Sequence, residues 1–324
     1  MSQHLLEGPR TILRRSGGGS ARLARVVRCR YRTAVRNLPV LVGLLAVLAT
    51  AEPARGDEPP LPMGVPDVVG ARGLALGAYR GMVGGNDSIF VNAAALAARR
   101  RYAVETQWLL DRAGSSNELQ LLTGSVVDSE GSVTGGFAYT RVFSGPWIGN
   151  LFHLPIAFPL ADRFFLGATA KYQSLDGPAS DQMRAANFDV SAFWQPSSIF
   201  SLGGAIYNVL SAGHRDQQPH AYGAGAAIGD DRTFHLAVDW RGDTQRQDHL
   251  TSLYAVGGEV LVSDFVPLRA GYVRDDTRHA SFWSAGAGFV TTSGFALDVA
   301  YRQCIERSDE RILAVGLKVF VTTQ

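Results

Sequence analysis

The sequence predicts an all-β fold: a transmembrane antiparallel β-barrel of about 14 strands, preceded by an N-terminal segment. Three observations predict it. A basic leader and an apolar run mark the chain for export, alternating apolar and polar side chains fill the rest of the chain in short segments, and turn residues separate these segments. Alternating segments of about ten residues are typical of strands that span an outer membrane.

The leader, residues 1–56, differs in charge from the remainder of the chain. It holds ten arginines and two acidic residues, whereas the remainder holds 21 basic and 27 acidic residues. The apolar run at 38–51 is shorter than the about 20 residues that a transmembrane helix needs. We therefore expect a signal peptide with an over-long basic leader, cleaved near Ala51 or Gly56. An N-terminal membrane anchor is the alternative.

Several classes of protein are excluded by the remainder of the chain. Its one cysteine, Cys304, allows neither an internal disulfide nor a CxxC metal site. No stretch after residue 56 is apolar over the about 18 residues of a membrane helix. We expect the outer membrane of a Gram-negative bacterium, with outer-membrane lipid around the barrel, no cofactor and no nucleic-acid partner.

The chain divides into the leader (1–56), an N-terminal segment rich in proline and glycine (57–100) and the barrel (101–324). An even number of strands brings both ends of a bacterial barrel to the periplasmic side. We expect fourteen strands, at 101–112, 118–128, 131–143, 150–159, 163–174, 186–195, 199–210, 219–228, 232–241, 249–262, 266–275, 279–290, 294–304 and 309–321.

The two faces of the expected strands differ in polarity. In 232–241, Leu236 and Val238 point to one face. His235 and Asp239 point to the other, because successive side chains of a strand alternate. A soluble β-sandwich would show the same alternation. The export signal, the length of the segments and the aromatic residues near their ends favour the barrel.

Charged side chains of both signs fall on the expected inner face. A pore that selects anions or cations would use one sign, whereas mixed charges pair with one another and with a hatch, because an unpaired buried charge is costly. We expect structural pairing for most of them. The candidates for lumen-facing positions are Glu105, Asp111, Lys171, Asp189, His235, Asp239, Arg241, Glu259, Arg269, Asp298, Arg302 and Lys318.

Residues 70–78 (GARGLALGA) and 86–97 (NDSIFVNAAALA) resemble the first segment of FadL and PorV/PorQ-type outer-membrane barrels, where a glycine-rich stretch leads into an Asn-Pro-Ala-Gly-Leu motif. Residues 166–172 and 202–209 fit later parts of the same pattern. Two features depart from it: Ala93 stands where the family has proline, and the part after the leader is shorter than FadL transporters.

The resemblance implies that residues 57–100 tuck into the lumen as a hatch. Glycines there would let the backbone pass close to the barrel wall, since glycine has no Cβ. A disordered periplasmic tail is the alternative. The expected hatch motif consists of Gly70, Gly73, Gly77, Asn86, Asp87 and Asn92.

Two functions follow from the resemblance. The first is passage of small hydrophobic or amphipathic compounds across the outer membrane, through the lumen or a lateral gap. The alternative is a non-transporting PorV/PorQ-like barrel that anchors or shuttles envelope protein partners of a secretion, motility or envelope-assembly machine. An enzyme is not expected, because the loop histidines show no catalytic spacing. No catalytic and no metal-ligating residues are predicted.

Overall fold

The chain folds into a closed antiparallel β-barrel. The expected signal peptide, its cleavage sites and residues 57–69 of the expected hatch lie outside the described residues. The computed structural model describes residues 70–321, apart from 113–117, 178–181, 211–217, 231–232 and 245–249.

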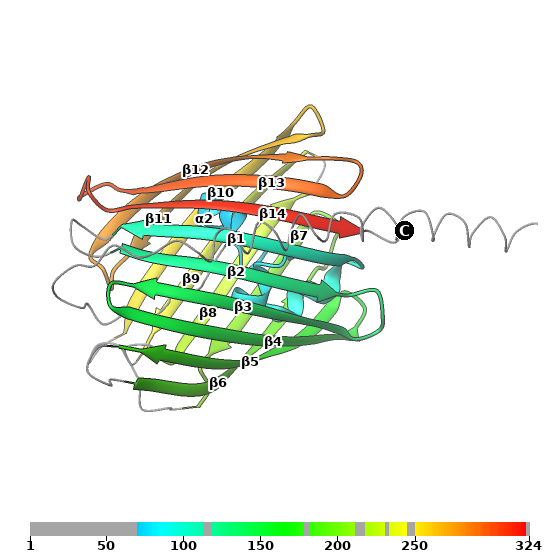
Figure 1. The fold of residues 1–324 in the computed structure, drawn as a ribbon. Helices are drawn as coiled ribbons and strands as arrows, with labels where there is room; N and C mark the ends of the chain where they lie inside the picture. Colours follow the sequence, from blue (N-terminus) through cyan, green and yellow to red (C-terminus); the bar gives the residue numbers. More distant parts are fainter. Residues whose placement is uncertain are drawn as a thin grey trace, which may run out of the picture.

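The barrel has fourteen strands, each hydrogen-bonded to its neighbours in sequence (Figure 1). They are β1 (Tyr102–Arg112), β2 (Glu118–Asp128), β3 (Thr134–Ser144), β4 (Trp147–Ala161), β5 (Phe164–Asp176), β6 (Gln182–Trp194), β7 (Phe200–Tyr207), β8 (Ala221–Gly229), β9 (Phe234–Asp243), β10 (Thr251–Val262), β11 (Val266–Asp275), β12 (Ala280–Val290), β13 (Phe295–Cys304) and β14 (Arg311–Val321).

The first and last strands close the barrel. β1 and β14 pair along their whole length, from Tyr102 opposite Val321 to Arg112 opposite Arg311. Closure leaves no strand edge, and so satisfies the condition that lipid imposes on a strand-built membrane protein. Among the described residues, no helix is both long and apolar enough to cross a bilayer.

The predicted fold class and strand number are confirmed, and the strand ends differ by a few residues. The largest difference is four residues, at the start of β6, and the end of β7 differs by three. β6 begins at Gln182 rather than 186, and β7 ends at Tyr207 rather than 210. β7 stops because Asn208 has a φ of 54°, in the left-handed region that asparagine tolerates, and its N–H turns to the Asp189 carboxylate.

The two ends of the barrel differ in their connections. The predicted short turns near residues 129, 196, 230 and 292 lie at the end where β1 begins and β14 stops, and the longer links lie at the other end. Outer-membrane barrels have short turns on the periplasmic side. We therefore name these the periplasmic end and the extracellular end.

The barrel is apolar outside and polar inside. On β9, Leu236 and Val238 are 54% and 53% exposed, whereas His235 and Asp239 are 7% and 5% exposed. A soluble sandwich would bury the apolar side chains instead. This distribution fits a barrel surrounded by lipid, and the soluble alternative is wrong.

Aromatic side chains gather on the outer face towards the extracellular end. Phe152 contacts Tyr139 and Tyr172 on the adjacent strands, with ring centroids 5.2 and 6.3 Å apart. On the other side of the barrel, Trp283 lies 5.6 Å from Tyr301. Tyrosine and tryptophan are enriched where a bilayer meets water, so this belt marks a membrane interface.

Candidate functional site: the barrel lumen

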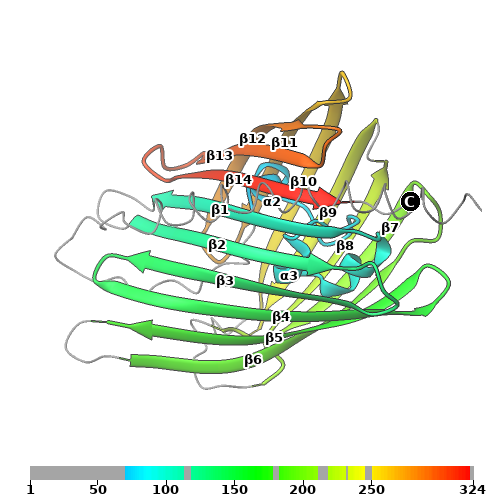
Figure 2. The same ribbon diagram turned by 45° about the vertical axis from the view of Figure 1, so that its right-hand side comes forward.

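A segment before β1 occupies the interior of the barrel. We call residues 70–98 the lumenal segment; it contains α2 (Ala71–Leu76), α3 (Ser88–Val91) and the 3-10 helix η1 (Ala93–Ala98). α2 contacts β10 to β14, α3 contacts β3 and β4, and η1 contacts β4 to β6, so the segment crosses the lumen. Figure 2 shows both α-helices within the ring of strands.

Asp87 ties the lumenal segment into a loop. Its carboxylate accepts hydrogen bonds from the backbone N–H groups of Gly70 and Gly73, at 2.9 and 3.2 Å, and from the Gln107 amide at 3.0 Å. α2 ends at Gly77, whose φ of 72° suits glycine. A carboxylate on the first N–H groups of α2 supplies partners that the helix itself lacks.

The two asparagines of the expected motif bind the lumenal segment to the wall and to itself. Asn86 donates to the Ser125 hydroxyl on β2 at 3.0 Å. Asn92 donates to the carbonyl oxygen of Arg80 at 2.9 Å and to that of Ala192 at 3.2 Å. All six motif residues therefore lie inside the barrel.

Glycines of the barrel wall lie directly against the backbone of the lumenal segment. A Cβ added to Gly257 on β10 would overlap the carbonyl oxygen of Leu76, and one on Gly203 would overlap that of Arg80. Within the segment, Gly81 lies comparably close to Ala226. The sequence predicted that glycines of the segment would allow this close approach. Further wall glycines with such contacts are Gly167, Gly225 and Gly271.

An ion network in the periplasmic half joins the lumenal segment to the wall. Arg72 of α2 and Arg269 of β11 both pair with Glu259 of β10, at 2.7 and 2.5 Å, and Arg269 also pairs with Asp298 at 2.5 Å. His235 Nδ1 lies 3.4 Å from Glu259. Burial lowers the pKa of Arg72, but Glu259, Tyr79 and Asp298 together outweigh it, and the net pKa is raised.

Other predicted lumen residues form separate pairs. Lys318 lies 2.9 Å from Glu105, and Lys171 lies 2.6 Å from Asp189. Asp239 pairs with Arg80 of the lumenal segment, a partner that the sequence analysis did not name.

The remaining three predicted lumen residues lie apart from these pairs. The Arg241 guanidinium stacks over the Tyr207 ring at 5.4 Å. Arg302 donates to the carbonyl oxygen of Leu74 at 2.8 Å. Asp111 lies at the extracellular end, 3.9 Å from Arg278.

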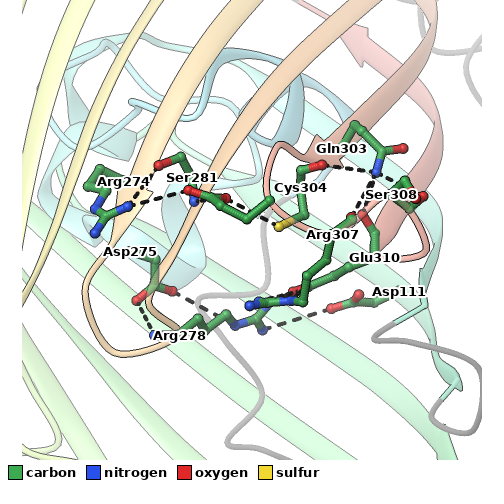
Figure 3. Close-up of polar contacts among 11 residues, drawn as sticks. Asp111, Arg274, Asp275, Arg278, Ser281, Gln303, Cys304, Arg307, Ser308 and Glu310 are labelled. Carbon is green, nitrogen blue, oxygen red and sulfur yellow. Dashed lines mark hydrogen bonds and ion pairs between the residues drawn. The ribbon is translucent and has the colours of Figure 1, made fainter.

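Arg278 joins the β11–β12 turn to the β13–β14 turn and to the end of β1, where Asp111 lies (Figure 3). It lies between β11 and β12, and its guanidinium is 3.4 Å from Glu310 and 3.8 Å from Asp275. Glu310 also pairs with Arg307 at 2.6 Å. Alternation along strands predicted Asp111 but could not place these partners, because most of them lie in turns.

The extracellular half of the lumen has an apolar lining. Leu121 and Val142 face each other across β2 and β3, are 1% and 0% exposed, and belong to one buried cluster with Phe90 of the lumenal segment. Alternation along the strands predicts apolar residues on the outer face only, so this inner lining was not predicted. The feature of the sequence that points to it is adjacent apolar pairs such as Leu121-Leu122. We name it the apolar layer: Leu121, Val142, Trp147, Leu151, Leu175, Met183, Val273 and Phe282.

The wall is weakest between β6 and β7. Only five residue pairs join these strands in the described residues, from Val190 opposite Ile206 to Trp194 opposite Leu202. Towards the extracellular end, the Asn187 side chain replaces the ladder, with hydrogen bonds of 2.8 and 2.9 Å to the carbonyl oxygen and N–H of Leu210.

A cavity of about 260 Å³ opens at the periplasmic end, between the lumenal segment and β9 to β14. Its lining includes the cationic side chains of Arg72, Arg101 and Arg269 and the apolar side chains of Leu261 and Phe320. No cluster of three potential metal ligands occurs among the described residues.

Neither a protein-family model nor a curated protein matches the sequence. Solved structures do match the fold. The monoaromatic hydrocarbon channel CymD has a TM-score of 0.59 at 11% identity, covering 79% of this chain and 98% of that chain. The Ralstonia pickettii toluene transporter TbuX has a TM-score of 0.59 at 11% identity, covering 78% and 97%. A Pseudomonas aeruginosa FadL homologue has a TM-score of 0.56 at 14% identity, covering 78% and 97%.

The alignments extend over nearly the whole of these chains. They confirm the FadL part of the resemblance at the level of the fold, while the PorV/PorQ part stays a prediction. The chain has the fold of the FadL-type outer-membrane β-barrels.

Proposed function

We propose that this barrel lets small hydrophobic or amphipathic compounds cross the outer membrane of a Gram-negative bacterium, and that the lumenal segment is the hatch that controls their passage. The apolar layer carries the proposal. It gives the extracellular half of the lumen a lining that favours apolar solutes over water.

The lining differs from that of a general porin, whose interior is polar and filled with water. An apolar solute gains about 25 cal/mol for each Å² of its surface that leaves water. Leu121, Val142 and Leu175 therefore attract toluene-sized compounds and offer a polar solute no hydrogen bonds. Such compounds would collect above the lumenal segment.

The route onward passes the lumenal segment. The segment fills the middle of the lumen, where it packs against the wall glycines and forms ion pairs with the wall. A compound therefore moves to the periplasmic end only when the segment shifts. The short β6–β7 pairing offers a lateral route as the alternative.

The neighbours in fold supply test compounds. CymD is described as a monoaromatic hydrocarbon channel and TbuX as a toluene transporter. Toluene is therefore the first compound to test on this chain, with glycerol as a polar solute of comparable size.

A second candidate function is a non-transporting barrel that anchors envelope protein partners. The tight packing of the lumenal segment favours it, because paired charges such as Arg72–Glu259 and Arg80–Asp239 are those of a permanent plug. Transport measurements distinguish the two candidates.

The test measures uptake of labelled toluene into vesicles that contain the purified barrel. Leu151→Gln places an amide in the apolar layer and should reduce uptake severalfold. Gln173→Leu, directly opposite on β5, enlarges the apolar surface and should leave uptake equal or higher. Glycerol entry should stay at the level of empty vesicles throughout. Absence of toluene uptake by the wild type would favour the anchoring barrel.

A further inference from the structure

We propose that the periplasmic cavity is a binding site for an oxyanion, held by the guanidinium group of Arg101. The proposal concerns binding alone and holds whether or not the barrel transports hydrophobic compounds. It rests on an unpaired buried cation, the cations around it and the shape of the cavity.

Arg101 is buried, and no described acidic residue pairs with it. It is 8% exposed, and within the described part of the chain its guanidinium donates only to the carbonyl oxygen of Gly84 in the lumenal segment. Its Nε atom is buried and has no hydrogen-bond partner among the described residues. No carboxylate lies within ion-pair distance of Arg101 in the described part of the chain, whereas Arg72, Arg269 and Lys318 all have such partners. An unpaired buried guanidinium is costly unless a ligand neutralises it.

A second and a third cation face the same cavity. Arg99 and Arg72 line it together with Arg101. Enclosure by the barrel, followed by the positive charges of Arg101 and Arg72, lowers the pKa of Arg99 to about 10. Burial lowers the pKa of Arg101, repulsion by Arg72 adds a smaller lowering, and Tyr79, Glu105 and Asp87 oppose both. The shifts reflect mainly the burial of two cations at the cavity, a cost that a bound anion would offset.

The chemistry of guanidinium narrows the ligand. Arginine binds carboxylates and phosphates through paired N–H groups, and such charge-assisted bonds are stronger than neutral ones. A cavity of about 260 Å³ accommodates an oxyanion with a small substituent. Leu261 and Phe320 also line it, so the arginines face the charged group while these two side chains face an apolar substituent. A small aromatic carboxylate fits both the cationic and the apolar lining, and therefore fits the cavity better than free phosphate.

The experiment measures binding to the full chain in detergent by isothermal titration calorimetry. The probes are benzoate, inorganic phosphate and the neutral benzyl alcohol. We expect benzoate to bind and Arg101→Gln to weaken binding about tenfold or more, the loss that follows from removing a charge-assisted hydrogen bond. Arg101→Lys keeps the positive charge but loses the paired N–H groups of the guanidinium. Its affinity for benzoate should therefore lie between those of the wild type and Arg101→Gln.

Arg302→Gln is the matched control. Arg302 is also a lumenal arginine that donates to a carbonyl oxygen of the lumenal segment, but it does not line the cavity. Its substitution should leave benzoate affinity within about twofold of the wild type. Phosphate binding as tight as that of benzoate, with the same dependence on Arg101, supports the oxyanion site and assigns it to the free anion.

Three results would overturn the proposal: no binding of either anion, equal affinity for benzyl alcohol and benzoate, or unchanged affinity in Arg101→Gln. Folding is checked independently by the thermal midpoint. Removing an uncompensated buried charge should leave that midpoint equal or higher, so loss of binding cannot be attributed to misfolding.

Discussion

Asp239 on β9 holds Arg80 of the lumenal segment through one carboxylate oxygen. Oδ2 of Asp239 accepts hydrogen bonds from the backbone N–H groups of Tyr79 and Arg80 at 2.7 and 2.8 Å, and lies 3.3 Å from the Arg80 guanidinium. Arg80 also donates to the Tyr207 hydroxyl at 2.8 Å. One side chain of the wall therefore fixes both the backbone and the charge of the segment.

Removing this carboxylate should destabilise the barrel. Asp239→Ala removes the carboxylate that pairs with a buried guanidinium and accepts from two backbone N–H groups, and we expect a loss of about 3 kcal/mol or more in the free energy of unfolding. Urea unfolding followed by tryptophan fluorescence measures it. Asp176→Ala removes an acid from an exposed pair with Arg184 and should change stability by less than about 1 kcal/mol. Equal effects of the two substitutions would contradict the role of Asp239.

The contact between Gly257 and the lumenal segment gives a second prediction. Gly257→Ala places a methyl group on the carbonyl oxygen of Leu76, and overpacking of this kind costs about 1–3 kcal/mol. Protease cleavage within residues 70–98 should become faster as the segment is displaced. Gly135→Ala is the control, since a Cβ there meets nothing within 4 Å. Equal cleavage rates in the two variants would show that the wall glycine is not needed.

The ion network predicts a rescue. Arg269→Met leaves Asp298 without its partner and should cost about 3–5 kcal/mol. Neutralising the stranded acid in Arg269→Met/Asp298→Asn should recover part of that loss, while Glu259 keeps Arg72. A double variant that is less stable than Arg269→Met in urea unfolding would refute the pairing.

Glu306, after β13, gives a prediction about pH. Its carboxylate accepts a hydrogen bond of 2.7 Å from the Ser281 N–H, which is the main reason that the pKa of Glu306 is lowered from 4.5 to about 2. A lowered folded-state pKa gives stability that is present above pH 4.5 and lost as pH falls towards 2. The Ser281 amide signal in NMR should titrate with a midpoint near 2, and not at all in Glu306→Gln. A midpoint above 4 would contradict the hydrogen bond.

Much of the barrel could be predicted from the sequence because alternation is local. Leu236, Val238, His235 and Asp239 each face the side that their position in the strand predicts. The end of β7 could not be predicted in this way, because it depends on the left-handed conformation of Asn208.

The lumen was harder to predict, because its chemistry depends on contacts between distant residues. The charges on the inner face were identified, but their partners Arg72, Arg80 and Arg278 lie in the lumenal segment or in a turn. The apolar layer was missed for a physical reason. Lipid outside the barrel and the apolar layer inside it both favour apolar residues. Neighbouring residues such as Leu121 and Leu122 are then both apolar, and the alternation of polar and apolar residues is lost.

Locking the lumenal segment to the wall tests the central claim most directly. A Cβ added to Gly316 on β14 lies 3.7 Å from the Cβ of Ala71 on α2, close to the about 3.8 Å typical of a disulfide. Ala71→Cys/Gly316→Cys, built with Cys304→Ala to remove the native thiol, should form a reducible tether. Single-cysteine variants serve as controls.

The measurement is toluene uptake by vesicles containing the oxidised double-cysteine protein, before and after reduction. If the lumenal segment is a hatch, oxidation reduces uptake to that of empty vesicles and reduction restores it, with no redox effect in the single-cysteine controls. Uptake that is equally fast in the oxidised and reduced protein would contradict a moving hatch.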